Sequence, residues 1–96
     1  MKMGTPGNPG PPPTILQEAA TVTHQRQTVY GLPEEYFSRY AELLSAYLGR
    51  NISPHQAVMI LLIGKVCRLQ ETPDHRDSIV DIAGYAACYA RVVLSE

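Results

Sequence analysis

Four charged side chains flank a short connection in the second half of the chain. Lys65 and Arg68 precede Thr72 by seven and four residues, and Asp77 and Asp81 follow it by five and nine. If both flanking segments are helices, they fold back as an antiparallel hairpin in which residues equally far from the turn face each other. This register places Arg68 level with Asp77. It also places Lys65 level with Asp81, and the apolar neighbours predict that all four side chains are at least half buried.

Burying charged side chains is unfavourable unless they are paired and hydrogen-bonded, which leaves two interpretations of this cluster. In one, the four residues form two buried salt bridges that fix the register of the helix pair. In the other they line a polar pocket, where Lys65 and Arg68 bind anionic oxygens and the aspartates orient a ribose, a metal ion or the basic side chains. We favour the pocket, because apolar packing alone would join two helices at lower cost.

Two further polar clusters are candidates for the same pocket. One cluster, with His24, Arg26 and Tyr30, lies at the end of the first apolar segment, where it could instead be a solvated helix end. The other, with His75, lies at the start of the last segment, where His75 could instead be an ordinary surface residue. The expected ligand-binding residues are therefore basic, acidic and aromatic side chains from three segments: His24, Arg26, Tyr30, Lys65, Arg68, His75, Asp77 and Asp81.

Three aspartates share one face of the last segment, at positions 74, 77 and 81. This spacing is compatible with a divalent cation. Hard cations require several carboxylate oxygens at once, however, and no second helix offers matching carboxylates. We therefore expect neither a metal site nor catalytic residues.

The elements that position these residues are helices, and the expected fold is an all-α bundle of three to four helices. Thr14, Ser53 and Thr72 are good helix caps, and prolines at positions 33, 54 and 73 suit a first helical turn. The apolar residues recur three and four apart, with no strand signal. The expected helices cover residues 14–27, 33–48, 54–71 and 73–94.

The first 13 residues differ from the rest of the chain. They contain three consecutive prolines and almost no apolar side chains, so we expect a disordered Pro/Gly-rich leader over 1–13 and a helical domain over 14–96. Hydrophobic residues make up 45% of the 96, which is more than a small domain easily buries. Residues 54–71 are apolar on two sides and residues 86–90 are rich in alanine, so we expect a homo-oligomer with one of these helices at the interface.

The net charge of −1 and the absence of a basic tract argue against binding to long nucleic acids. The longest apolar run, residues 57–64, is too short to span a bilayer, so we expect no membrane association. Cys67 and Cys88 lie in apolar patterns and are expected to be buried free thiols. Together these features predict a cytoplasmic protein.

Several of these residues form motifs. Lys65-x-x-Arg68-Leu69 precedes the run HRDSIVDIAGYA of residues 75–86, and Arg26-x-x-x-Tyr30-Gly31 precedes Glu34-Glu35. This pattern resembles a phage-encoded family of small uncharacterised helical proteins. More distantly it is similar to the nucleotide-modification-associated domain of phages, and further off to the all-α MazG-like NTP pyrophosphatases. The resemblance implies a phage origin, which would place the protein in the host cell cytoplasm, a helical bundle and a nucleotide ligand.

The pyrophosphatase pattern is not matched in one respect. MazG-like enzymes hold magnesium with Glu-x-x-Glu on one helix and Glu-x-x-Asp on another. In this chain residues 33–48 carry Glu34, Glu35 and Glu42 without that spacing, and Asp77 and Asp81 are four apart rather than three. This departure favours binding over hydrolysis.

The function expected from the sequence is non-catalytic nucleotide binding by a phage protein. Such a protein would sequester, as a sponge, a host immune signal of the cyclic dinucleotide or cyclic ADP-ribose type. One alternative is a pyrophosphatase of the MazG type, for which Mg²⁺ would be the cofactor. Another is a structural or host-factor-binding helical oligomer.

Overall fold

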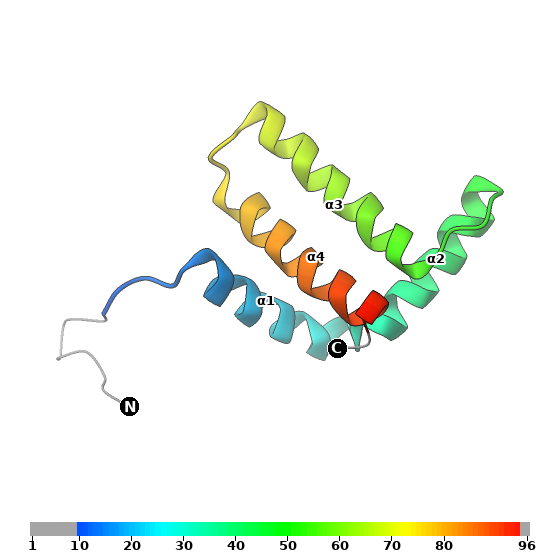
Figure 1. Ribbon diagram of the computed structural model, residues 1–96, viewed down its shortest axis with the longest axis horizontal. Coiled ribbons are helices and arrows are strands. Elements are labelled where there is room, and N and C mark those ends of the chain that lie inside the picture. The colour runs from blue at the N-terminus through cyan, green and yellow to red at the C-terminus, as the bar shows by residue number, and fades with distance from the viewer. Residues whose placement is uncertain (1–9, 95–96) are drawn as a thin grey trace.

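The computed structural model describes residues 10–94, and this part of the chain contains four helices and no strand. The helices are α1 (Ile15–Tyr30), α2 (Pro33–Leu48), α3 (Pro54–Glu71) and α4 (Arg76–Leu94) (Figure 1). The expected all-α fold is therefore confirmed, with four helices. Residues 1–9 of the expected leader lie outside the described residues, and residues 10–13 are exposed and contain no helix.

Two of the helices begin as their sequences predict. The Thr14 hydroxyl accepts a hydrogen bond from the Gln17 backbone N–H at 3.2 Å, while the Gln17 side chain accepts one from the Thr14 N–H at 2.9 Å. Ser53 and Gln56 form the same reciprocal pair at the start of α3. These bonds satisfy N–H groups that have no partner within a helix, so they fix where α1 and α3 start.

The expected bounds of two helices are wrong by three residues. The first helix continues to Tyr30 rather than residue 27, and Gly31 ends it with a positive φ of 84°. The last helix begins at Arg76 rather than residue 73. Thr72 ends α3, where its backbone N–H donates to the Arg68 carbonyl, and its own carbonyl accepts from the His75 N–H in a turn that precedes α4. Residues 72–75 form the connection.

His75 caps α4 in place of the expected Thr72. The His75 carbonyl accepts from the backbone N–H groups of Ser78 and Ile79, at 3.2 and 3.3 Å. Its Nδ1 also accepts from the Ser78 N–H at 3.3 Å and lies 2.8 Å from the Ser78 hydroxyl. The histidine ring thus provides a partner for the buried hydroxyl of Ser78.

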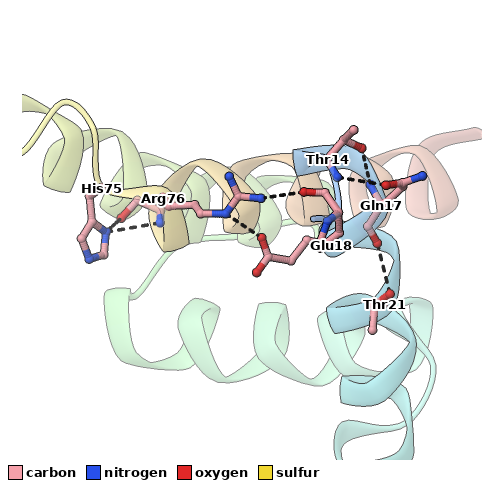
Figure 2. Close-up of polar contacts among 8 residues, drawn as sticks. Thr14, Gln17, Glu18, Thr21, His75 and Arg76 are labelled. Carbon is pink, nitrogen blue, oxygen red and sulfur yellow. Dashed lines mark hydrogen bonds and ion pairs between the residues drawn. The ribbon is translucent and has the colours of Figure 1, made fainter. Parts of the chain in front are cut away.

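The start of α1 is held against the start of α4. Arg76 Nε donates to the Glu18 carboxylate at 3.0 Å, and Arg76 Nη2 donates to the Pro13 carbonyl at 3.1 Å (Figure 2). The end of α4 is held against the start of α2, where Arg91 Nη2 lies 2.8 Å from Glu34 Oε1. Contacts therefore anchor α4 to its neighbours at both of its ends.

Helix α4 is the centre of the bundle. It packs against each of the other three helices, whereas α1 and α3 do not contact each other. Figure 1 shows α1 and α3 on either side of α4, with α2 crossing near the C-terminal end of α4. Helix α4 therefore lies between α1 and α3 and connects them.

The apolar core is small. Its buried members are Phe37, Ala41, Ala57 and Val58, with partly buried tyrosines and aliphatic side chains packed around them. Of the two cysteines expected to be buried, Cys88 is half-buried but Cys67 is exposed, at the edge of an open hollow between α3 and α4. None of the helices within residues 10–94 has the length and apolarity needed to cross a bilayer.

Candidate functional site

A cavity of about 290 Å³ lies over α4, between α1 and α3. Helix α1 supplies Arg26 and Tyr30 to its wall, and α3 supplies Lys65. Asp81 and Tyr85 reach it from α4, one helical turn apart. We call this cavity, together with Tyr36 and Gly84 that also line it, the central pocket.

One carboxylate joins three helices inside the central pocket. Asp81 Oδ2 lies 2.9 Å from Lys65 Nζ, and Asp81 Oδ1 lies 3.3 Å from Arg26 Nη2. The Asp81 side chain is only 12% exposed, while those of Lys65 and Arg26 are 37% and 49% exposed. Two cations thus share one carboxylate, which leaves one positive charge in excess and several N–H donors without a protein acceptor.

Aromatic rings form another wall of the central pocket. The Tyr30 and Tyr36 rings pack with their centroids 5.3 Å apart. Burial raises the pKa of both Tyr36 and Tyr85 above the usual range, so both phenols are neutral at physiological pH. Their hydroxyl groups remain donors, and their rings offer flat apolar surface to a ligand.

The close approach of α1 and α4 depends on Gly84. A Cβ atom at this position would lie 3.1 Å from the Thr23 hydroxyl oxygen of α1, which is tighter than ordinary contact. The absent side chain lets α1 lie near enough for Arg26 to reach Asp81. The pKa of the neighbouring Cys88 thiol is raised by burial, so this group lines the pocket in its protonated, weakly polar form.

A second, more open hollow lies between α3 and α4. The Lys65–Asp81 pair borders both hollows, and the second one, which we call the hairpin hollow, continues to Arg68, His75 and Asp77. Arg68 Nη2 lies 3.4 Å from His75 Nε2. No third helix covers this hollow, since α1 lies on the other side of α4.

The hairpin register predicted one of its two pairs correctly. Lys65 and Asp81 face each other and form an ion pair, as expected. Arg68 and Asp77 form no ion pair among residues 10–94, and both are exposed rather than half buried. Asp77 falls in the first turn of α4, and it lines the same open hollow as Arg68 without pairing with it.

The structure divides the eight expected site residues into three groups. Arg26, Tyr30, Lys65 and Asp81 line the central pocket. Arg68, His75 and Asp77, with the Lys65–Asp81 pair, line the hairpin hollow. His24 is exposed and lines neither of them.

Sequence reasoning missed Tyr36, Gly84 and Tyr85 as pocket residues. The signal for Tyr85 was present, because it follows Asp81 by four residues on the same helical face. Gly84, with the nearby alanines, indicates close helix packing, but the sequence does not show which helix packs there. Within the described residues, no three or more histidine, cysteine, aspartate or glutamate side chains form a group able to hold a metal ion.

Comparison with known proteins places the chain among phage relatives. Residues 14–93 match the family described as a domain of unknown function, DUF6378. The chain is 40% identical over 80 residues to the Gene 55 protein of Mycobacterium phage D29. It is 34% identical over 85 residues to the Gene 55 protein of Mycobacterium phage L5.

These alignments cover 82% and 86% of the chain but only 53% and 54% of the two phage proteins, so the chain spans about half the length of these relatives. No solved structure matches. The expected relationship to small phage-encoded proteins is confirmed at the level of the family. Because the match extends over all four helices and the residues that line the central pocket, the chain belongs to the DUF6378 family.

Proposed function

We propose that the central pocket binds a nucleotide or cyclic nucleotide without turning it over. The observation that carries this proposal is the sharing of Asp81 by Lys65 and Arg26 beside exposed and half-buried tyrosine rings. A nucleotide combines an anionic phosphate with a flat base, and this pocket pairs excess positive charge with aromatic surface.

Different residues of the central pocket would contact the phosphate and the base of such a ligand. The phosphate oxygens accept from the donors of Lys65 and Arg26 that Asp81 does not occupy. The base packs on Tyr30, which is 52% exposed, or on its neighbour Tyr36. The volume of about 290 Å³ is close to the lower limit of the ~300–1,000 Å³ typical of small-molecule sites, which suits a small ligand rather than a polymer.

The phage relatives support a role in the infected host cell. A small phage protein that holds a nucleotide intact would act as a sponge for a host immune signal, of the cyclic dinucleotide or cyclic ADP-ribose type. The resemblance of the helix α4 motif to the nucleotide-modification-associated domain and to MazG-like proteins supports the ligand class. The unmatched carboxylate spacing of the latter supports binding rather than hydrolysis.

The proposal is tested by incubating the purified protein with a panel of linear and cyclic nucleotides, with and without Mg²⁺. Binding is followed by calorimetry, and the nucleotide is then recovered after the protein is denatured. We expect at least one member to bind and to be recovered unchanged. Recovery of a monophosphate and pyrophosphate would instead identify a magnesium-dependent pyrophosphatase, and absence of binding across the panel would favour a structural or host-factor-binding protein.

The chain offers a matched pair of variants for this experiment. Arg26 and Arg76 both form ion pairs across helices, and their side chains are 49% and 52% exposed. Only Arg26 lines the central pocket. Arg26→Met should weaken nucleotide binding at least tenfold, whereas Arg76→Met should leave it unchanged. Equal effects of the two substitutions would contradict the proposed site.

A further inference from the structure

The central pocket has a charged end and an aromatic end. Arg26, Lys65 and Asp81 form the charged end through the ion pairs that join them. The pocket continues to the corner between α1 and α2, where the rings of Tyr30 and Tyr36 pack against each other. If a nucleotide places its phosphate at the charged end, its base lies at the aromatic end.

Gln27 lies between these two ends. It is half-buried and lines the pocket. It precedes Tyr30 by three residues and follows Thr23 by four, so the three side chains share one face of α1. Thr23 approaches Gly84 of α4, and Figure 1 shows that α1 and α4 run in the same direction. Gln27, one turn beyond Thr23, is therefore level with Cys88, one turn beyond Gly84, and both line the pocket.

The side-chain amide of Gln27 has no partner inside the described chain. Among residues 10–94 it forms no hydrogen bond, whereas Arg26 and Lys65 are paired with Asp81. The Cys88 thiol, whose pKa is raised by burial, stays protonated and is only a weak hydrogen-bonding group. An amide carries an N–H donor beside a carbonyl acceptor. It can therefore form two parallel hydrogen bonds with a group that presents an acceptor beside a donor.

Adenine presents that pattern. Its N7 atom accepts while its N6 amino group donates, and a glutamine amide pairs with both in nucleic-acid recognition. Guanine presents two acceptors on the same edge, N7 and O6, which suit arginine or lysine instead. On its other edge guanine carries an N2 amino group, and the buried side chains of Pro33 and Phe37 that line the aromatic end offer no acceptor for it. A pyrimidine has a smaller ring and buries less surface against the aromatic end.

We propose that Gln27 reads the edge of the base, which makes the ligand of the central pocket an adenine nucleotide. This inference rests on the proposed nucleotide binding and adds the identity of the base. In the complex the Gln27 carbonyl accepts from the N6 amino group and its N–H donates to N7, while the ring lies against Tyr30 or Tyr36. Arg26 and Lys65 contact phosphate whichever base is present, so Gln27 supplies selectivity.

Calorimetric titration with matched nucleotides tests the selectivity. The probes are AMP, GMP, CMP and UMP as one set, and cyclic di-AMP and cyclic di-GMP as another, because the members of each set differ only in the base. In the set that binds better, we expect the adenine member to bind at least tenfold more tightly than the guanine member. Equal affinities, or tighter binding of another base, would overturn this inference while leaving nucleotide binding intact. Absence of binding by every probe would overturn both.

Two glutamines of α1 supply a variant and its control. Gln27→Glu replaces the amide by a carboxylate that only accepts, so it loses the bond to N7 of adenine and matches the N1–H and N2 amino donors of guanine. The ratio of adenine to guanine affinity should fall at least tenfold. Gln25→Glu adds the same charge to the same helix at an exposed position that lines neither hollow, and it should leave the ratio unchanged. Equal changes in the two variants would overturn the assignment to Gln27.

Gln27→Leu removes the amide without adding a charge. The affinity ratio should again fall at least tenfold, through weaker binding of the adenine member. Because the amide has no partner inside the described chain, the melting temperature without nucleotide should stay the same. A large drop in melting temperature would show that the amide supports the fold, and an unchanged ratio would show that another group reads the base; either result would overturn the proposal.

Discussion

The two hollows beside the α3–α4 hairpin differ in how many helices enclose them. Both are lined by charged residues that hairpin register brings near one another. The central pocket gains a third wall from α1, and Arg26 of that helix adds a second cation to Asp81. The hairpin hollow has only two helices, and the charged residues that line it alone, Arg68 and Asp77, are exposed. The charge pattern of the hairpin is similar beside both hollows, and what encloses one of them is the third helix, α1.

The largest expected difference concerns the two aspartates. Asp81→Ala removes the acceptor of both Lys65 and Arg26 in partly buried surroundings, and hydrogen bonds to charged groups contribute about 1.5–3 kcal/mol each. We expect the free energy of unfolding to fall by roughly that amount in total, because both cations retain access to water. Asp77→Ala should change it by less than about 0.5 kcal/mol, since this side chain is exposed. Urea unfolding of the two variants would measure the difference, and similar losses would contradict the comparison.

A smaller effect is expected from His75 in the hairpin hollow. Its ring and carbonyl cap α4, so His75→Ala should lower the free energy of unfolding by about 1 kcal/mol, as the loss of a helix cap does. His75→Asn keeps a capping side chain and should recover most of the loss. His24→Ala, at an exposed position outside both hollows, serves as the control in the same urea titration. If His24→Ala and His75→Ala were equivalent, the capping role would be wrong.

The smallest effect concerns the ion pair that joins α2 to the end of α4, away from both hollows. The hydrogen bonds from Arg91 hold the pKa of Glu34 below its usual value. A carboxyl group with a lowered pKa in the folded state contributes stability above its unfolded pKa, and that contribution is lost as the pH falls. Arg91→Gln should therefore weaken the decline in melting temperature below about pH 4.5. A melting-temperature profile from pH 7 to pH 3 that is unchanged by the substitution would contradict this pair.

The positions of the helices follow closely from local signals in the sequence. Proline and capping side chains correctly predict where α2 and α3 start. The start of α4 could not be predicted in this way. Thr72 and Pro73 are residues that favour a cap and a first helical position, whereas histidine is not among the common caps. In the structure Thr72 to His75 form a turn instead, and the first N–H groups of α4 donate to the His75 carbonyl.

The candidate site follows from the sequence only where its residues lie on one hairpin. Hairpin register predicts the Lys65–Asp81 pair, since both residues belong to adjacent antiparallel helices. The Arg26–Asp81 pair joins residues 55 positions apart and depends on how α1 packs on α4. Gly84 indicates that a helix packs closely there, but no short-range pattern shows that this helix is α1. The contribution of α1 to the pocket could therefore not be predicted from the sequence.

The most direct test of the nucleotide site compares the two cations of α3 that border the two hollows. Lys65→Met and Arg68→Met each remove one positive charge from the same helix, but only Lys65 lines the central pocket. Calorimetric titration with the tightest-binding nucleotide of the panel should show an affinity loss of at least tenfold, or about 1.4 kcal/mol, for Lys65→Met. Arg68→Met should lose less than about threefold. Equal losses, or a larger loss for Arg68→Met, would contradict the assignment of the ligand to the central pocket.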